Sequence, residues 1–362
     1  MTELSDLPIR DDLRGLTPYG APQQNVRVRL NVNENTHSIP EDVATDIVTA
    51  LANAVLGVNR YPDREFTQLR ESLAGYLGSG LTRANIWAAN GSNEVLQQVL
   101  QAFGGPGRSV LGFPPTYSMH SIIATGTGTR WIEASRDADY AISPGTAVRA
   151  IEREKPDIVF LCSPNNPTGT PLALETIAAA YEATEGILLV DEAYAEFADG
   201  PTALTLLEGR PRLLVSRTMS KAFAFAGARV GYLAADPAVT DAMRLVRLPY
   251  HLSAFTQAAA VAALAHAPEM LAMVADIKLQ RDRMIVALPE LGYAPLPSAA
   301  NFVLFGGVAD PQATFLALLE QGILIRDVGI PHHLRVTAGS DAETTIFLDA
   351  LGQLGGVGRI AP

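Results

Sequence analysis

Short apolar runs separated by helical patterns occupy the first two thirds of the chain. Seven runs are apolar at successive positions, at 86–88, 110–112, 131–132, 158–161, 187–190, 213–215 and 230–233. Strands that are apolar on both faces belong to sheets that are covered on both faces, which are mostly parallel. The pattern therefore predicts an α/β domain whose seven-stranded, mostly parallel sheet is covered by helices.

The pattern divides the chain into three segments. Residues 1–35 contain prolines and charges without periodicity and predict an extended N-terminal arm that packs across a neighbouring subunit. Residues 36–247 hold the predicted sheet, preceded by helical patterns at 40–56 and 64–77. Residues 248–362 change to long helical patterns at 253–266 and 268–291, apolar runs at 302–305, 323–325 and 334–336, and a last helix at 342–354. This last segment predicts a smaller α+β domain.

Composition limits the classes of function. The chain has 362 residues, of which 48% are hydrophobic and 18% charged, as in a globular enzyme. Its net charge of −11 argues against nucleic-acid binding and favours small-molecule partners. With Cys162 as the single cysteine, no internal disulfide can form, and no apolar run is long enough to span a membrane. We therefore expect a cytoplasmic protein. The six histidines show no metal-ligand spacing, so no metal site is expected.

One lysine lies in an apolar loop at 216–229. Lys221 follows Ser220 directly, and Arg229 comes eight residues later. Burial lowers the pKa of a lysine because it penalises the ammonium, and the neutral amine that results attacks carbonyl compounds. Pyridoxal phosphate (PLP) chemistry requires such an amine. A solvated surface lysine is the alternative that this segment alone leaves open.

Polar residues follow the predicted strands at the edge where α/β sheets bind their ligands. Asp191 follows the run at 187–190 and can pair with a protonated pyridine nitrogen, although it could also cap the next turn. Tyr194 places a phenol three residues further on. Asn166, in the proline-rich turn at 162–169, can donate a hydrogen bond to a ring oxygen.

Two further strand ends carry candidate ligand contacts. Gly91, Ser92 and Asn93 precede a helical pattern, where free N–H groups attract phosphate. Tyr117 follows the run at 110–113 and is placed to stack on a flat ring.

Taken together, these residues resemble those of the fold-type-I PLP-dependent aminotransferases, and most closely of their histidinol-phosphate aminotransferase family. The resemblance covers nearly the whole chain, from the segments at 16–20 and 30–35 to the one at 334–337. It implies PLP as the cofactor and makes residues 36–247 the large PLP-binding domain.

The resemblance also implies a role for each matching residue. Lys221 would bind the cofactor covalently and move the proton between the substrate Cα and the cofactor. Asp191 would pair with the pyridine nitrogen, and Asn166 and Tyr194 would hold the ring hydroxyl. The phosphate would be held by Ser92, Asn93, Thr218, Ser220 and Arg229. Tyr117 would stack on the ring, and Tyr61 would reach the cofactor phosphate of a partner subunit, which implies an obligate homodimer.

The substrates that the resemblance implies are L-histidinol phosphate and 2-oxoglutarate, converted to imidazole-acetol phosphate and L-glutamate in histidine biosynthesis. Arginine suits both anions because its planar fork binds carboxylate or phosphate bidentately. The expected substrate contacts are Arg335, Arg326, Tyr19, Asn93, Tyr117, Asn166 and Tyr250. For Arg326, a structural ion pair with Asp327 is the alternative.

The sequence leaves some other functions open and excludes others. An aromatic amino-acid aminotransferase of the same subgroup, or a PLP-dependent decarboxylase of a phosphorylated amino acid, would use the same lysine. A P-loop ATPase is excluded because the chain lacks G-x-x-x-x-G-K-[ST], and a dinucleotide-binding fold because Gly126 and Gly128 lack a third glycine. A non-catalytic scaffold would leave the placement of Asn166, Asp191 and Lys221 unexplained.

Overall fold

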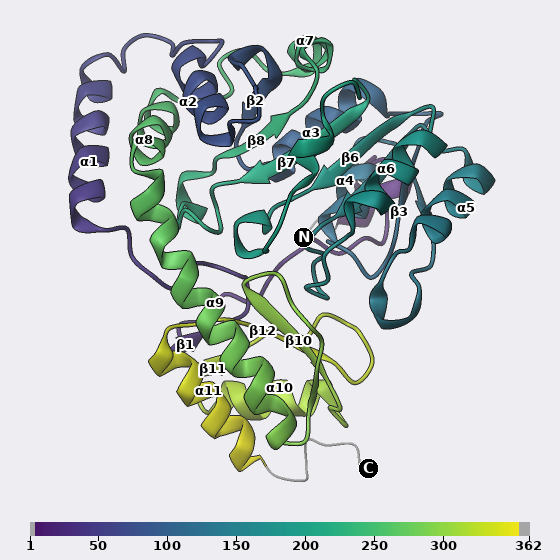
Figure 1. Ribbon diagram of the computed structural model, residues 1–362, viewed down its shortest axis with the longest axis vertical. Coiled ribbons are helices and arrows are strands. Elements are labelled where there is room, and N and C mark those ends of the chain that lie inside the picture. Colours follow the sequence, from purple (N-terminus) through teal and green to yellow (C-terminus); the bar gives the residue numbers. More distant parts are fainter. Residues whose placement is uncertain (1–3, 355–362) are drawn as a thin grey trace.

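The computed structural model describes residues 4–354. Residues 1–3 of the predicted arm and 355–362 of the predicted C-terminal domain lie outside the described part. At the centre is a seven-stranded sheet in the order β2-β8-β7-β6-β5-β3-β4 (Figure 1). Its strands are β2 (Ile86–Ala89), β3 (Ser109–Gly112), β4 (Arg130–Glu133), β5 (Ile158–Cys162), β6 (Ile187–Asp191), β7 (Leu213–Thr218) and β8 (Gly231–Ala234).

Each of the seven apolar runs forms one of these strands, so the predicted sheet is confirmed. β8 is antiparallel to both of its neighbours, and the four pairings among β3 to β7 are parallel. Every residue of β2, β3, β5, β6, β7 and β8 is buried, as strands covered on both faces must be. The register pairs Cys162 with Asp191, and Asp191 with Ser216, so three neighbouring strands end side by side.

Helices cover this sheet or connect its strands: α2 (Thr67–Leu77), α3 (Ser92–Phe103), α4 (Met119–Gly126), α5 (Pro144–Glu154), α6 (Leu174–Ala183) and α7 (Pro237–Val246). Two more helices, α1 (Glu41–Leu56) and α8 (Ala254–Ala265), pack against each other beside them. The limits predicted for α1 and α8 agree with the structure to within one residue. α2 begins three residues later than predicted, because the Asp63 carboxylate accepts the N–H groups of Glu65 and Thr67 and holds 63–66 in a turn.

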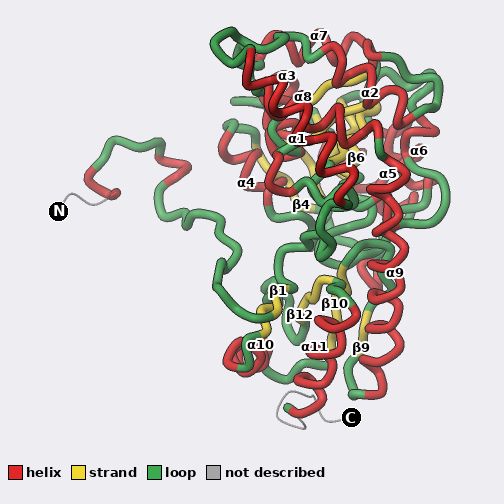
Figure 2. Tube along the Cα trace, turned by 90° about the vertical axis from the view of Figure 1, so that its left-hand side faces the viewer, coloured by secondary structure: helices red, strands yellow, loops and turns green. Residues whose placement is uncertain are grey.

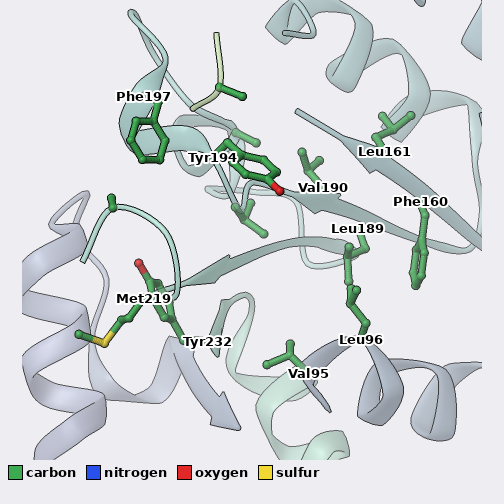
Figure 3. Packing of buried hydrophobic residues seen from close by; sticks show 14 of the residues in the cluster. Val95, Leu96, Phe160, Leu161, Leu189, Val190, Tyr194, Phe197, Met219 and Tyr232 are labelled. Atoms are coloured by element: carbon green, nitrogen blue, oxygen red, sulfur yellow. The ribbon is translucent and has the colours of Figure 1, made fainter. Parts of the chain in front are cut away.

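The main core lies between the sheet and its helices. Figure 3 shows Val95 and Leu96 of α3 facing side chains of β5 and β6, among them Phe160 and Leu189. These four residues are at most 2% exposed. At roughly 1.5–3 kcal/mol for each large apolar side chain that is buried, this packing fixes the strand ends from which the polar residues project.

A second, smaller lobe lies below the sheet in Figure 1. It contains the antiparallel sheet β12-β10-β9 and the parallel pair β1-β11. Its strands are β1 (Val28–Arg29), β9 (Ala294–Pro295), β10 (Phe302–Gly306), β11 (Ile323–Leu324) and β12 (Leu334–Thr337), and its helices are α9 (Ala267–Glu290), α10 (Pro311–Glu320) and α11 (Asp341–Gln353).

Two elements cross the predicted domain limits at residues 35 and 247. β1 comes from the predicted arm and pairs with β11 of the smaller lobe. α8 follows residue 247 but packs against α1 and α2. The limits themselves stay a prediction, and these contacts show how closely the three segments are joined.

The N-terminal segment projects from the side of the molecule before it reaches β1 (Figure 2). Arg10 anchors it, because the Arg10 guanidinium donates hydrogen bonds to the carbonyl oxygens of Thr125 and Gly126 in α4. Among residues 4–354, no single helix has both the length and the apolarity needed to cross a bilayer. Only the pair α8 and α9, taken as one segment with a bend of 76° between the two helices, has that length and apolarity.

Candidate active site

A cavity of about 390 Å³ opens at the carboxyl ends of the parallel strands. This volume lies in the usual range for small-molecule sites. The structure brings thirteen of the predicted site residues to it: Tyr19, Ser92, Asn93, Tyr117, Asn166, Asp191, Tyr194, Thr218, Ser220, Lys221, Arg229, Arg326 and Arg335. Tyr61 and Tyr250 are not among the residues that line it.

Lys221 projects into this cavity from the loop after β7. Its Nζ donates a hydrogen bond to the backbone oxygen of Val32 at 2.9 Å, and the Asn35 side chain donates to the carbonyl oxygens of Lys221 and Ala222. Burial, with smaller effects from the Arg335 and Arg229 charges, lowers the pKa of the Lys221 ammonium to about 8, although Glu34 opposes the shift. The amine is therefore partly neutral near pH 7, as imine formation requires.

This pKa predicts how the rate of cofactor attachment depends on pH. The neutral amine is the reactive form, so the rate at which cofactor-free protein binds PLP covalently should rise with pH and level off above about 8. A solvated lysine, with a pKa near 10.4, would show no plateau in this range. Stopped-flow absorbance between pH 6 and 9.5 measures the rate, and a rise that continues unchanged to pH 9.5 would contradict the assignment.

The start of α3 and the loop before β8 form a cradle that fits a phosphate. Gly91 has φ +84°, and a β-carbon there would collide with the Arg229 guanidinium. A β-carbon on Gly231 would collide with the backbone of Gly91 and Ser92. Both glycines therefore let the helix start approach Arg229 and β8, and the free N–H groups of a helix start bind anions.

Hydroxyl groups complete this cradle. Thr218 Oγ1 lies 2.9 Å from Ser220 Oγ and accepts the Ser220 N–H, and Arg229 Nη1 lies 3.4 Å from Ser220 Oγ. Ser92, Thr218, Ser220 and Arg229 all line the cavity. The side chains thus supply a cation and hydroxyl donors, which are the groups that a phosphate monoester binds.

Asp191, the last residue of β6, places a buried carboxylate at the inner wall. His120 Nε2 donates to Asp191 Oδ2 at 3.1 Å, and Ser216 Oγ donates to Asp191 Oδ1 at 3.3 Å. Both neighbours are buried too. A carboxylate held in place by these two hydrogen bonds can face a cation in the cavity, such as a protonated ring nitrogen.

Asn166, Tyr194 and Arg335 form a connected network beside Lys221. Arg335 Nη1 donates to Asn166 Oδ1 at 2.6 Å, and Asn166 Nδ2 donates to Tyr194 Oη at 3.2 Å. Burial raises the pKa of Tyr194 to about 12, so its hydroxyl stays protonated and can donate. On the other side, Tyr117 donates from its hydroxyl to Asn93 Oδ1 at 3.2 Å. The cavity thus offers donors for a ring oxygen, a carboxylate for a ring nitrogen and a cradle for a phosphate, and these residues fit PLP.

Two arginines give the cavity positive charge. Burial lowers the pKa of Arg335 to about 10, which still leaves it charged at neutral pH. The Arg326 guanidinium lies 6.0 Å from the centre of the Tyr19 ring. Among residues 4–354 Arg326 forms no ion pair, and Asp327 Oδ1 instead accepts the N–H of Gly329, which speaks against the alternative pairing with Asp327. Two arginines thus face the space next to Lys221.

Sequence reasoning missed several residues that hold this site. Arg136, which is partly buried and has no carboxylate partner in the described part of the chain, donates to the Phe113 carbonyl at 2.7 Å and to Asn165 Oδ1 at 2.8 Å. It thereby ties the loop of Tyr117 to the turn of Asn166. Asn33 and His120 were missed as well. Their signals are contacts between distant segments, which no local motif reveals.

Tyr61 and Tyr250 lie together outside this cavity. Their rings stack with centroids 4.4 Å apart, and Tyr61 is 79% exposed. Neither is in a position to touch a ligand in the cavity of its own chain. Among the described residues, no group of three or more His, Cys, Asp or Glu side chains is arranged to hold a metal ion.

Comparison with known proteins gives consistent results. The family model for aminotransferase class I and II matches residues 26–351. Histidinol-phosphate aminotransferases from Paenarthrobacter aurescens and Thermobifida fusca are 61% and 56% identical to this chain, over 97% and 96% of its length and 96% and 95% of theirs. The crystal structure of histidinol-phosphate aminotransferase from Sinorhizobium meliloti in complex with pyridoxal-5'-phosphate superposes with a TM-score of 0.85 at 27% identity, covering 96% of this chain and 97% of that one.

Proposed function

Because the chain belongs to the class I and II aminotransferases and, within them, to the histidinol-phosphate aminotransferase family, we propose that it transfers the amino group of L-histidinol phosphate to 2-oxoglutarate. The products are imidazole-acetol phosphate and L-glutamate, and the reaction is a step of histidine biosynthesis. The cofactor is pyridoxal phosphate. The observation that carries the proposal is the cavity itself, in which a lysine with a lowered pKa, a buried carboxylate and two arginines face one another.

The cavity residues would bind the cofactor and act on the substrate through it. Bound PLP supplies an aldehyde that takes up the amino group and a ring that accepts electrons when the substrate Cα loses its proton. Lys221 would hold the cofactor and move the proton at Cα. Asp191 would keep a proton on the ring nitrogen, Asn166 and Tyr194 would donate to the ring oxygen, and Tyr117 would lie against the ring. The cradle at Ser92, Asn93, Thr218, Ser220 and Arg229 would hold the phosphate of the cofactor.

A panel of amino donors tests the substrate. We expect kcat/KM for L-histidinol phosphate to exceed that for phenylalanine or tyrosine by at least about tenfold, because a phosphate gains charge-assisted bonds from arginines that an aromatic ring cannot make. An equal or higher value for phenylalanine would favour an aromatic aminotransferase. Release of carbon dioxide from a phosphorylated amino acid, without transfer to 2-oxoglutarate, would favour a decarboxylase.

Replacing Arg335 by alanine should raise KM for both substrates, by about 50-fold each, since the same arginine would bind the anionic group of each in turn. Arg326→Ala is the matched control. It should raise KM for L-histidinol phosphate and change KM for glutamate less than about threefold, because Arg326 would bind the phosphate. Steady-state kinetics in both directions separates the two arginines, and an unchanged KM for both substrates in the Arg335 variant would refute its shared role.

We further propose that the chain works as a homodimer in the cytoplasm. Leu56 and Val58, just before Tyr61 in the chain, and Leu248, just before Tyr250, also expose apolar side chains. A second copy packed on this surface would bury them and bring Tyr61 to the cofactor phosphate of its partner. Tyr250 would join the partner's substrate site in the same way.

A further inference from the structure

Asn33 lies in the cavity wall, in the segment that follows β1. Its side chain is 2% exposed and its backbone has φ 56°. The Asn33 Nδ2 donates a hydrogen bond to Tyr194 Oη at 2.9 Å, a shorter distance than the 3.2 Å from Asn166 Nδ2 to the same oxygen. Tyr194 Oη therefore has two amide neighbours, which come from segments 133 residues apart (166 minus 33).

The hydrogen-bond partners of each amide determine its orientation. Arg335 can only donate, so the atom of Asn166 that faces it is the oxygen, and the Asn166 amide nitrogen faces Tyr194. For Asn33, the Thr337 hydroxyl accepts the backbone N–H at 3.0 Å and donates to Asn33 Oδ1 at 3.1 Å. With the amide reversed, the Thr337 proton would have no acceptor among the described residues.

The phenol oxygen thus accepts two N–H bonds, one from each amide. Both amides can only donate to it, so the proton of Tyr194 must point away from both of them. Tyr194 lines the cavity, where the ring oxygen of the cofactor would lie and could accept this proton. Asn33 is itself rigidly held, because Asn301 Nδ2 donates to its carbonyl oxygen at 3.1 Å.

We propose that Asn33 is a positioning residue, which directs the Tyr194 hydroxyl proton to the ring oxygen of the cofactor. This inference rests on the proposed function, since it needs PLP in the cavity. Asn33 acts through Tyr194 and not by touching the reacting atoms. Thr337 and Asn301 in turn hold Asn33 in place. The orientation of the Tyr194 hydroxyl therefore depends on the segment that follows β1 and on the smaller lobe.

The direction of this proton affects the charge on the cofactor. A donated hydrogen bond stabilises the negative ring oxygen, most strongly after the nitrogen that joins Lys221 to the cofactor has lost its own proton. Loss of the bond should therefore favour the protonated form of that nitrogen. The pH midpoint of the absorption change of the bound cofactor should rise.

A double-mutant cycle with absorption spectroscopy tests the inference. Asn33→Gly removes the amide without straining a backbone of positive φ, and Tyr194→Phe removes the hydroxyl. We expect Asn33→Gly to raise the midpoint by about one pH unit, and to shift it by less than about 0.2 unit in the Tyr194→Phe background. Asn33→Gly should also raise the apparent Kd for PLP, and by more with Tyr194 present than in the Tyr194→Phe background.

A second variant covers the case in which Asn33→Gly does not fold. Asn33→Asp keeps the shape of the side chain and the Thr337 bond, but it presents an oxygen that would take the Tyr194 proton. Asn33→Asp should raise the pH midpoint of the absorption change clearly more with Tyr194 present than in the Tyr194→Phe background. Equal shifts in the two backgrounds, or no shift with Tyr194 present, would overturn the role of Asn33.

The same spectra separate this inference from the proposed function. If the unmodified protein gives no cofactor absorption band after addition of PLP, the proposed function fails. If the band is present and the cycle shows no coupling between positions 33 and 194, only the role of Asn33 fails. The choice of amino donor does not enter either result.

Discussion

Replacing Lys221 by alanine should lower kcat by about 10⁴-fold or more. A lysine positioned for proton transfer contributes about 10²–10⁴-fold, and a covalent link to the cofactor would add to this. No other described lysine can replace it. The chain has two more, Lys155 at the end of α5 and Lys278 in α9, where Lys278 pairs with Asp199, and neither lines the cavity.

Lys278→Ala is the matched control for this prediction. It removes a lysine and one partly exposed ion pair, so kcat should stay within about twofold and stability should change by less than about 1 kcal/mol. Circular dichroism and thermal unfolding establish that both variants are folded. A Lys221→Ala variant that is folded and keeps more than a tenth of the original kcat would contradict the role of this lysine.

Replacing Asp191 by asparagine should lower kcat by about 10²–10³-fold. The change keeps the shape of the side chain and removes the negative charge that would hold a proton on the ring nitrogen, so the ring accepts electrons less readily in the transition state. KM should change much less than kcat, because Asp191 would touch the cofactor and not the substrate. Pre-steady-state kinetics of the amino-group transfer from L-histidinol phosphate measures this step.

The control for Asp191 is Asp157→Asn, at the opposite edge of the same sheet. Asp157 follows α5 and its carboxylate accepts the N–H of Ser109 at 2.8 Å, so the substitution affects a hydrogen bond of the sheet but no residue of the cavity. We expect its kcat to stay within about twofold. If the two asparagine variants had equal activities, the carboxylate at 191 would have no special role.

The sequence predicted the strands of the large sheet because each run is apolar on both faces, a pattern that burial between helices imposes. It also placed Asp191, Asn166 and Lys221 at the same edge, since parallel strands end on one side of a sheet. The start of α2 was less predictable. Helical periodicity extends to residue 64, and only the hydrogen bonds that the Asp63 carboxylate accepts reveal that the helix begins at Thr67.

Contacts between distant segments were beyond the reach of local patterns. Nothing near Asn33 indicates that its amide meets Tyr194, because that contact requires β1 to pair with β11 and β12 to bring Thr337 alongside. Arg136 is a similar case, in which one guanidinium joins two loops. The role proposed for the exposed stack of Tyr61 and Tyr250 depends on a second subunit, which no pattern within one chain reveals.

The central claim is that Lys221 is the residue that binds pyridoxal phosphate. Incubation of the protein with PLP, reduction with sodium borohydride and mass mapping of the peptides test it most directly, and with three lysines in the chain the result is unambiguous. We expect a single pyridoxyl-phosphate adduct, on the peptide that contains Lys221. An adduct on Lys155 or Lys278 instead, or no adduct at all, would contradict the claim.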